Sequence, residues 1–103
     1  MEKEPTKLFK TNDTHLVAYL RTLGFHIDKA IKALDVDKYG STVEIVHLMF
    51  YETTQLQEAI YTYIQGQALV EPKNYIKNFK FLSYQIGKFK QYDDFKFEAH
   101  NNS

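Results

Sequence analysis

The segment from Thr42 to Tyr51 constrains the fold most, because nearly all its residues are β-branched, aromatic or long aliphatic. Such a run predicts a β-strand. Alternate residues fall on opposite sides of a strand, and both sides become apolar after Glu44. We therefore expect this strand at the centre of a sheet or covered on both faces. The preceding residues 37–41 form a turn signal, which predicts a β-hairpin over 31–51.

The stretch before that turn is ambiguous. Phe25 and Ile27 alternate as in a strand. A second apolar set follows a helical spacing and consists of Ile27, Ala30, Ile31 and Leu34. Residues 26–36 are therefore compatible with either a strand or a helix.

A first helix is predicted over about 14–23. Thr11-Asn12-Asp13 supplies oxygen atoms that can cap its N-terminus. Gly24 stands where a left-handed C-terminal residue belongs, and Phe25 can fold back over the last turn. The apolar face is expected to hold Leu16, Leu20 and Leu23, with Val17 beside them.

Two further helices are predicted in the second half of the chain. Thr54 and Gln57 fit a capping box in which Thr54 is the N-cap, and this helix runs to about Gln65. The next helix covers about 72–91, with a proline tolerated in its first turn.

Leu8 to Lys10 adds a short candidate strand, so the predicted order of elements is β-α-β-β-α-α. We expect an α+β fold in which helices pack on a small antiparallel sheet. A chain of 103 residues fits one domain. We assign residues 1–6 to a flexible leader, 7–91 to the domain and 92–103 to a polar tail with Phe95 and Phe97 as anchors.

Composition excludes several classes of protein. Thirteen basic and thirteen acidic residues give a net charge of zero, which argues against a globally basic nucleic-acid binder. Without cysteine there is neither a disulfide framework nor a thiolate metal site. The longest apolar run, Ile45–Tyr51, is too short to span a bilayer, and the first residues are too polar for a secretory signal. We expect no membrane partner and a location in the cytoplasm of a host cell.

The predicted helix over 72–91 carries the strongest functional pattern. At 100° per residue, one narrow stripe holds Lys73, Lys77, Lys80, Tyr84 and Lys88. No acidic residue occurs between Lys73 and Gln91. The stripe fits a surface that meets phosphates, with Tyr84 able to stack on a base. The competing interpretation is an ordinary solvated helix face.

No pattern indicates catalysis or a metal site. The four histidines lack metal-ligand spacing, and His47 is interpreted as a half-buried strand residue. Asp35 and Asp37 are interpreted as turn residues, because their neighbours lack the further oxygen ligands of a calcium loop. We therefore assign no catalytic residue, metal or cofactor, and do not expect an enzyme.

Two segments resemble a known family. Residues 13–25 resemble D-x-x-L-x-A-Y-L-x-x-x-G-F, and residues 63–75 resemble Y-x-N-G-x-x-L-V-D-P-x-x-F. Together they are similar to small uncharacterised domains of bacteriophages and mobile elements in low-GC bacteria. The chain departs at Gln65, Glu71 and Tyr75, and its 26–42 region is longer. The resemblance implies a viral or mobile-element origin and the β-α-β-β-α-α order, and it transfers no catalytic residue.

These observations favour a non-enzymatic accessory protein that binds nucleic acid or a host protein through the lysine stripe. The alternative is a virion or assembly component that acts through protein–protein interfaces. Aromatic residues make up 16% of the chain, more than so small a core can enclose, so some of them must line a surface. One interpretation is half-buried tyrosines with their hydroxyls in water. The other is a ligand face or self-association into a homo-oligomer.

Overall fold

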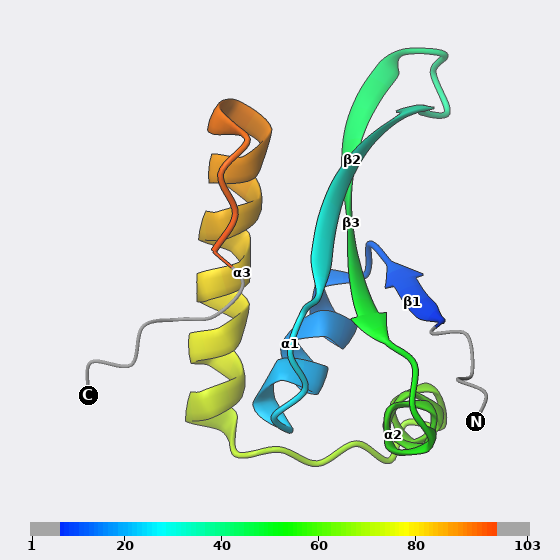
Figure 1. Cartoon of the computed structure of the whole chain (residues 1–103), viewed down its shortest axis with the longest axis vertical. Helices are drawn as coiled ribbons and strands as arrows, with labels where there is room; N and C mark the ends of the chain where they lie inside the picture. The colour runs from blue at the N-terminus through cyan, green and yellow to red at the C-terminus, as the bar shows by residue number, and fades with distance from the viewer. Residues whose placement is uncertain (1–6, 97–103) are drawn as a thin grey trace, which may run out of the picture.

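The computed structural model describes residues 7–96. Its elements follow in the order β1 (Leu8–Thr11), α1 (Thr14–Thr22), β2 (Lys29–Val36), β3 (Thr42–Tyr51), α2 (Thr54–Ile64) and α3 (Pro72–Tyr92) (Figure 1). The strands form one antiparallel sheet in the order β1-β3-β2. The fold is therefore α+β with the predicted order of elements.

The β2–β3 hairpin makes residues 29–36 of the ambiguous stretch a strand, whereas residues 26–28 precede it without regular structure. Antiparallel pairing places Ile31 opposite His47 and Ala33 opposite Ile45. The helical alternative for this stretch is wrong, because the ladder with β3 satisfies the backbone of β2 in extended form. β3 is the central strand, as its composition predicts.

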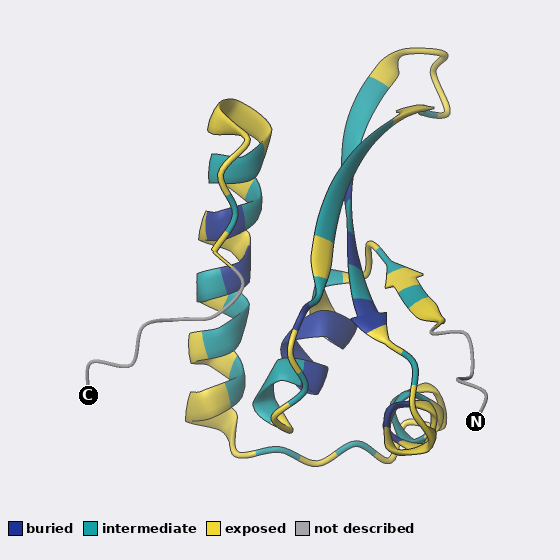
Figure 2. Cartoon of the chain, viewed as in Figure 1, coloured by how far each residue is buried: buried dark blue, intermediate teal, exposed yellow. Residues whose placement is uncertain are grey.

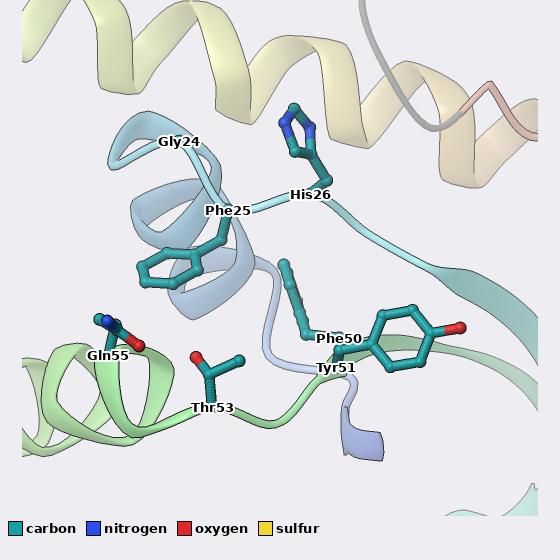
Figure 3. A pocket seen from close by; sticks show the side chains of 7 residues that line it. All are labelled: Gly24, Phe25, His26, Phe50, Tyr51, Thr53 and Gln55. Atoms are coloured by element: carbon teal, nitrogen blue, oxygen red, sulfur yellow. The ribbon is translucent and has the colours of Figure 1, made fainter. Parts of the chain in front are cut away.

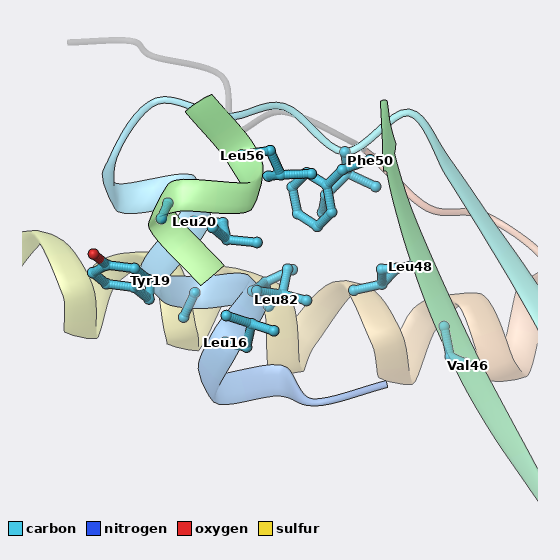
Figure 4. Close-up of a cluster of buried hydrophobic side chains, with 12 residues drawn as sticks. Leu16, Tyr19, Leu20, Val46, Leu48, Phe50, Leu56 and Leu82 are labelled. Atoms are coloured by element: carbon cyan, nitrogen blue, oxygen red, sulfur yellow. The ribbon is translucent and has the colours of Figure 1, made fainter. Parts of the chain in front are cut away.

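The helices cover one face of the sheet. Val46, Leu48 and Phe50 point to that face and are buried (Figure 4). Ile45 and Met49, which alternate with them, are only half-buried, and Figure 2 shows this alternation along β3. The apolar character of β3 on both sides therefore reflects its central position, and not helices on both faces.

α1 lies between the sheet and α3, with α2 beside it (Figures 1 and 4). All five residues from Leu16 to Leu20 are buried, so contacts surround this helix. Asp13 caps it by accepting from the backbone N–H groups of His15 and Leu16. The predicted place of Leu23 on the apolar face is wrong: the helix ends at Thr22, and Leu23 turns outward with 45% of its surface exposed.

The start of α2 also differs from its prediction. Thr53, and not Thr54, is the N-cap, and its hydroxyl oxygen accepts from the Leu56 N–H at 3.0 Å. Gln57 donates to the Glu52 carboxylate at 3.3 Å instead of reaching back to a cap. Two adjacent threonines offer the same cap chemistry, and the extended backbone at Thr53 selects the first one.

α3 extends one residue beyond its predicted end, and Asp93 then adopts a left-handed conformation with φ 59°. The chain turns back along α3, so that Lys96 donates its N–H to the buried Gln85 side chain at 3.0 Å. Phe95 packs on the core and meets the Phe89 ring edge-on. The expected leader, 1–6, and Phe97 lie outside the described residues.

Leu82 tests how α3 is held, because its side chain is fully buried against the core. Leu82→Ala is expected to cost about 2–5 kcal/mol of unfolding free energy, through lost burial and the cavity it leaves. Ile76→Ala on the same helix is the matched control: Ile76 is 49% exposed, so we expect a cost below about 1 kcal/mol. Urea unfolding measures both, and equal losses would contradict this packing.

Candidate nucleic-acid interface

The lysine stripe lies along the face of α3 that points away from the core. Lys73, Lys77 and Lys80 are exposed on it, while Leu82 on the opposite side is buried. Helical spacing explains the separation, since residues three, four and seven apart share a face. No carboxylate within the described residues forms an ion pair with these three lysines. Their charges are therefore available to a ligand.

Lys88 at the other end of the stripe differs from them. Its side chain is 29% exposed, and its Nζ lies 3.7 Å from an Asp94 carboxylate oxygen. The same ammonium group lies 5.6 Å from the centre of the Tyr84 ring. Lys88 is thus partly neutralised before any ligand arrives, which the sequence could not reveal because the turn at Asp93 brings Asp94 back.

The aromatic residues near the stripe are not equivalent. Tyr84 is 63% exposed, so one face of its ring can meet a ligand base or another planar group. Phe81, at the border of the stripe, instead lies under the Arg21 guanidinium, 4.5 Å from its ring centre. Arg21 also donates to the Asn78 amide oxygen at 3.1 Å. Phe81 is thus part of the α1–α3 contact, and Tyr84 is the aromatic residue that the stripe presents.

A cluster of polar aromatic groups joins α1, α2 and α3, and sequence reasoning missed it. The His15 ring nitrogen Nδ1 lies 3.0 Å from the Tyr75 hydroxyl, and the same ring stacks on Phe79. Burial, followed by the Asp13 carboxylate, raises the pKa values of Tyr63 and Tyr75. A raised pKa keeps these hydroxyls protonated, which suits a hydrogen-bonding role and opposes one as nucleophile or base.

The remaining candidates occupy structural positions. His47 is half-buried on the open sheet face, opposite Ile31. The Asp37 carboxylate accepts from the N–H groups of Tyr39 and Ser41, each at 2.9 Å, which closes the hairpin turn. Asp35 accepts from the Val36 N–H at 2.8 Å. Within residues 7–96, no three metal-ligating side chains come together.

Comparison with known families places the chain. A family model for a domain of unknown function, DUF5659, matches residues 6–87. The chain belongs to the DUF5659 family. No curated protein and no solved structure matches it. The expectation of an uncharacterised domain family is thereby confirmed.

The region that matches the DUF5659 model includes most of the lysine stripe. Lys73, Lys77, Lys80 and Tyr84 lie inside it, whereas Lys88 and Asp94 follow its end. The partly neutralised end of the stripe therefore lies outside the matched region. Among the helices within residues 7–96, none combines the length and apolarity needed to cross a bilayer.

The DUF5659 domain also holds an open, largely apolar pocket of about 490 Å³ at one end of the sheet (Figure 3). Its lining consists of Gly24, Phe25, His26, Phe50, Tyr51, Thr53 and Gln55. The neighbouring Asp28 carboxylate raises the pKa of the Tyr51 hydroxyl, so this group stays a neutral donor. None of the stripe residues lines the pocket, and it is a separate surface.

The tyrosine cluster gives a prediction about alkaline pH. Because the pKa values of Tyr63 and Tyr75 are raised from 10.0, folding favours their protonated forms. Their contribution to stability is complete below pH 10 and is lost as the pH rises through the folded-state pKa values. Tyr63→Phe with Tyr75→Phe should therefore flatten the fall in unfolding free energy above this pH.

Urea unfolding at several alkaline pH values measures that slope. Tyr61→Phe is the matched control, because Tyr61 is 64% exposed on α2, and it should keep the wild-type slope. The slope is the readout because the double variant also loses the His15 contact at neutral pH. A double variant with an unchanged slope would refute the role of this cluster.

Proposed function

We propose that this DUF5659 domain is a non-enzymatic accessory protein that binds nucleic acid through the lysine stripe of α3. The observation that carries the proposal is the set of three exposed lysines without ion pairs within the described residues, Lys73, Lys77 and Lys80. The chain has thirteen basic and thirteen acidic residues, yet this helix has no acidic residue between Lys73 and Gln91.

The spacing of the lysines suits a phosphate backbone. Lys73 and Lys80 are separated by about 10 Å along the helix axis, at 1.5 Å per residue. Phosphates of one strand advance by about 3.4 Å per nucleotide, so the three lysines match a few consecutive phosphates. Ammonium groups act as point charges without the bidentate geometry of arginine, and the stripe contains no arginine. The supported activity is therefore binding with little sequence preference, with Tyr84 stacking on an exposed base.

The resemblance of residues 13–25 and 63–75 to phage domains adds a biological setting to the proposal. In that setting the protein acts in the cytoplasm of an infected bacterium, on nucleic acid or on a host protein. The position of the gene tests this part: replication or anti-defence genes beside it support the proposal, and a gene far from any phage or mobile-element gene contradicts it.

A virion or assembly component is the second candidate, and the open face of the sheet favours it. Ile31, Ile45 and Met49 lie on that face without a covering helix in the described part of the chain. Half-buried apolar residues on an uncovered face are typical of protein interfaces. Mass spectrometry of purified particles separates the candidates, since a structural component is present in them and a cytoplasmic accessory protein is absent.

Charge reversal tests the lysine stripe. Lys77→Glu with Lys80→Glu should weaken binding to single- and double-stranded DNA and RNA. On double-stranded DNA, the plot of the logarithm of the binding constant against the logarithm of salt concentration should become less steep by about two, because about 0.9 counterion is released per phosphate contact. On single strands the decrease should be smaller, since about 0.7 counterion is released per contact. A salt titration monitored by fluorescence anisotropy measures both effects.

Lys10→Glu with Lys38→Glu is the matched control. Both residues are exposed and lie away from α3, on the sheet and the hairpin turn. This variant has the same net charge as the test variant, so it separates a local site from overall charge. Equal affinity in wild type and test variant would rule out the stripe as the binding surface.

A further inference from the structure

The second edge of the sheet is an unpaired eight-residue strand. The strand order puts β2 at an edge, with β3 on its other side. In an antiparallel ladder, successive residues direct their N–H and C=O groups to opposite edges. Asp37 donates its N–H to the Ser41 carbonyl at 2.9 Å, so odd-numbered residues of β2 pair with β3. The even-numbered residues therefore direct their backbone groups to the free edge.

One backbone group at this edge is already hydrogen-bonded within the chain, and the others are not. The Val36 N–H donates to the Asp35 carboxylate, which blocks that end of the edge. Within the described residues, no hydrogen bond closes the edge at Ala30, Lys32 or Leu34. Leu34 is also 74% exposed although it belongs to the helix-covered face. Unpaired backbone groups beside an exposed apolar side chain form a template for another strand.

We infer that two copies of this chain pair antiparallel through β2, with the two-fold axis at Lys32. The helix-covered faces of the two copies lie on the same side of the joined sheet only if odd-numbered residues of one copy lie opposite odd-numbered residues of the other. With the axis at Lys32, Lys29 of each copy lies opposite Asp35 of the other, which gives two ion pairs of opposite charge. The pairing also uses the three free residues and leaves the protected Val36 N–H outside.

The side chains on the helix-covered face of the two paired strands are compatible with this register. Leu34 lies opposite the partner's Ala30, which covers part of its exposed side chain. Lys32 approaches the partner's Lys32, but each ammonium group already forms an ion pair with its own Asp93. Shifting the axis to Ala33 would place Ile31 opposite a carboxylate, Asp35, and would require the Val36 N–H. The charges and the free backbone groups thus select the same register.

The proposed dimer contains one six-stranded sheet, which is built from the two three-stranded sheets of its copies. Ile31 of one copy meets Ala33 of the other, so the two open sheet faces become one continuous apolar surface. An axis perpendicular to the sheet keeps both α3 helices on the same side. The proposal does not depend on nucleic-acid binding, since no residue of the lysine stripe belongs to β2.

Charge exchange between copies tests the edge. Lys29→Glu and Asp35→Lys each place like charges opposite each other twice in a homodimer, and should weaken self-association by about tenfold or more. An equimolar mixture of the two variants restores both opposite-charge pairs and should associate as wild type does. Both residues are exposed, so the fold should survive, which circular dichroism checks. Sedimentation velocity over a range of concentrations measures association.

A crosslink tests the register, and the absence of native cysteine makes its result direct. Lys29→Cys with Asp35→Cys places a cysteine pair in disulfide range between copies, and oxidation should give a covalent dimer. Lys29→Cys alone is the control: its two copies would stand about 20 Å apart, six residues along the strand, and should not crosslink.

Three results would overturn the inference. Wild-type protein that stays monomeric at the highest soluble concentration excludes the dimer. A dimer that both charge variants leave intact lies at another surface. A mixture that fails to associate, while each variant keeps its fold, shows that Lys29 and Asp35 do not face each other.

Discussion

The burial of α1 is the constraint on which the other contacts depend. A helix of nine residues has little stability of its own in water, so tertiary packing must hold it. Leu48 and Phe50 from the sheet, Leu56 from α2 and Leu82 from α3 all belong to the same core as this helix (Figure 4). Removal of any one layer would expose part of the buried run from Leu16 to Leu20 to water. The sheet and the three helices are therefore expected to fold as one cooperative unit.

Polar contacts along the seam between α1 and α3 fix how α3 is rotated. The Asn78 side chain makes two of these contacts, because it accepts a hydrogen bond from Arg21 and donates one to the Thr22 hydroxyl. His15 adds a stacking contact with Phe79 near the other end of α1. A helix pinned in rotation on one side must present a fixed set of residues on the other. The outward direction of the lysine stripe is thus set by the α1–α3 contact.

Local chemistry predicts much of this fold, and long-range pairing decides the rest. The composition of β3 and the Asp13 and Gly24 signals of α1 are readable because each residue acts on its near neighbours. The strand β2 cannot be predicted in the same way, because the spacing of its apolar residues fits a helix as well as a strand. Only the pairing with β3 decides between them. Thr53 is the N-cap in place of Thr54 because of the point at which the chain leaves β3, and no local sequence rule predicts that point.

The candidate site likewise has one property that local spacing predicts and another that depends on long-range contacts. Helical spacing alone places Lys73, Lys77 and Lys80 on one face, as it does Tyr84 and Lys88. Whether each charge is available depends on tertiary structure, because Asp94 reaches Lys88 only through the left-handed turn at Asp93. The state of a charge is a property of its neighbours in space, so sequence spacing can locate the stripe but cannot say which of its lysines is neutralised.

Charge number limits what one copy of the stripe can achieve. Three available lysines release about three counterions on binding, a small number beside the six to ten phosphate contacts of tight DNA binders. Two stripes on one side of a six-stranded sheet would double that number, and the second set would bind at the high effective concentration that a shared scaffold provides. If both proposals hold, pairing at the β2 edge would compensate for the few phosphate contacts that one α3 can make. The proposed dimer would then bind nucleic acid more tightly than the monomer through two copies of the same lysines.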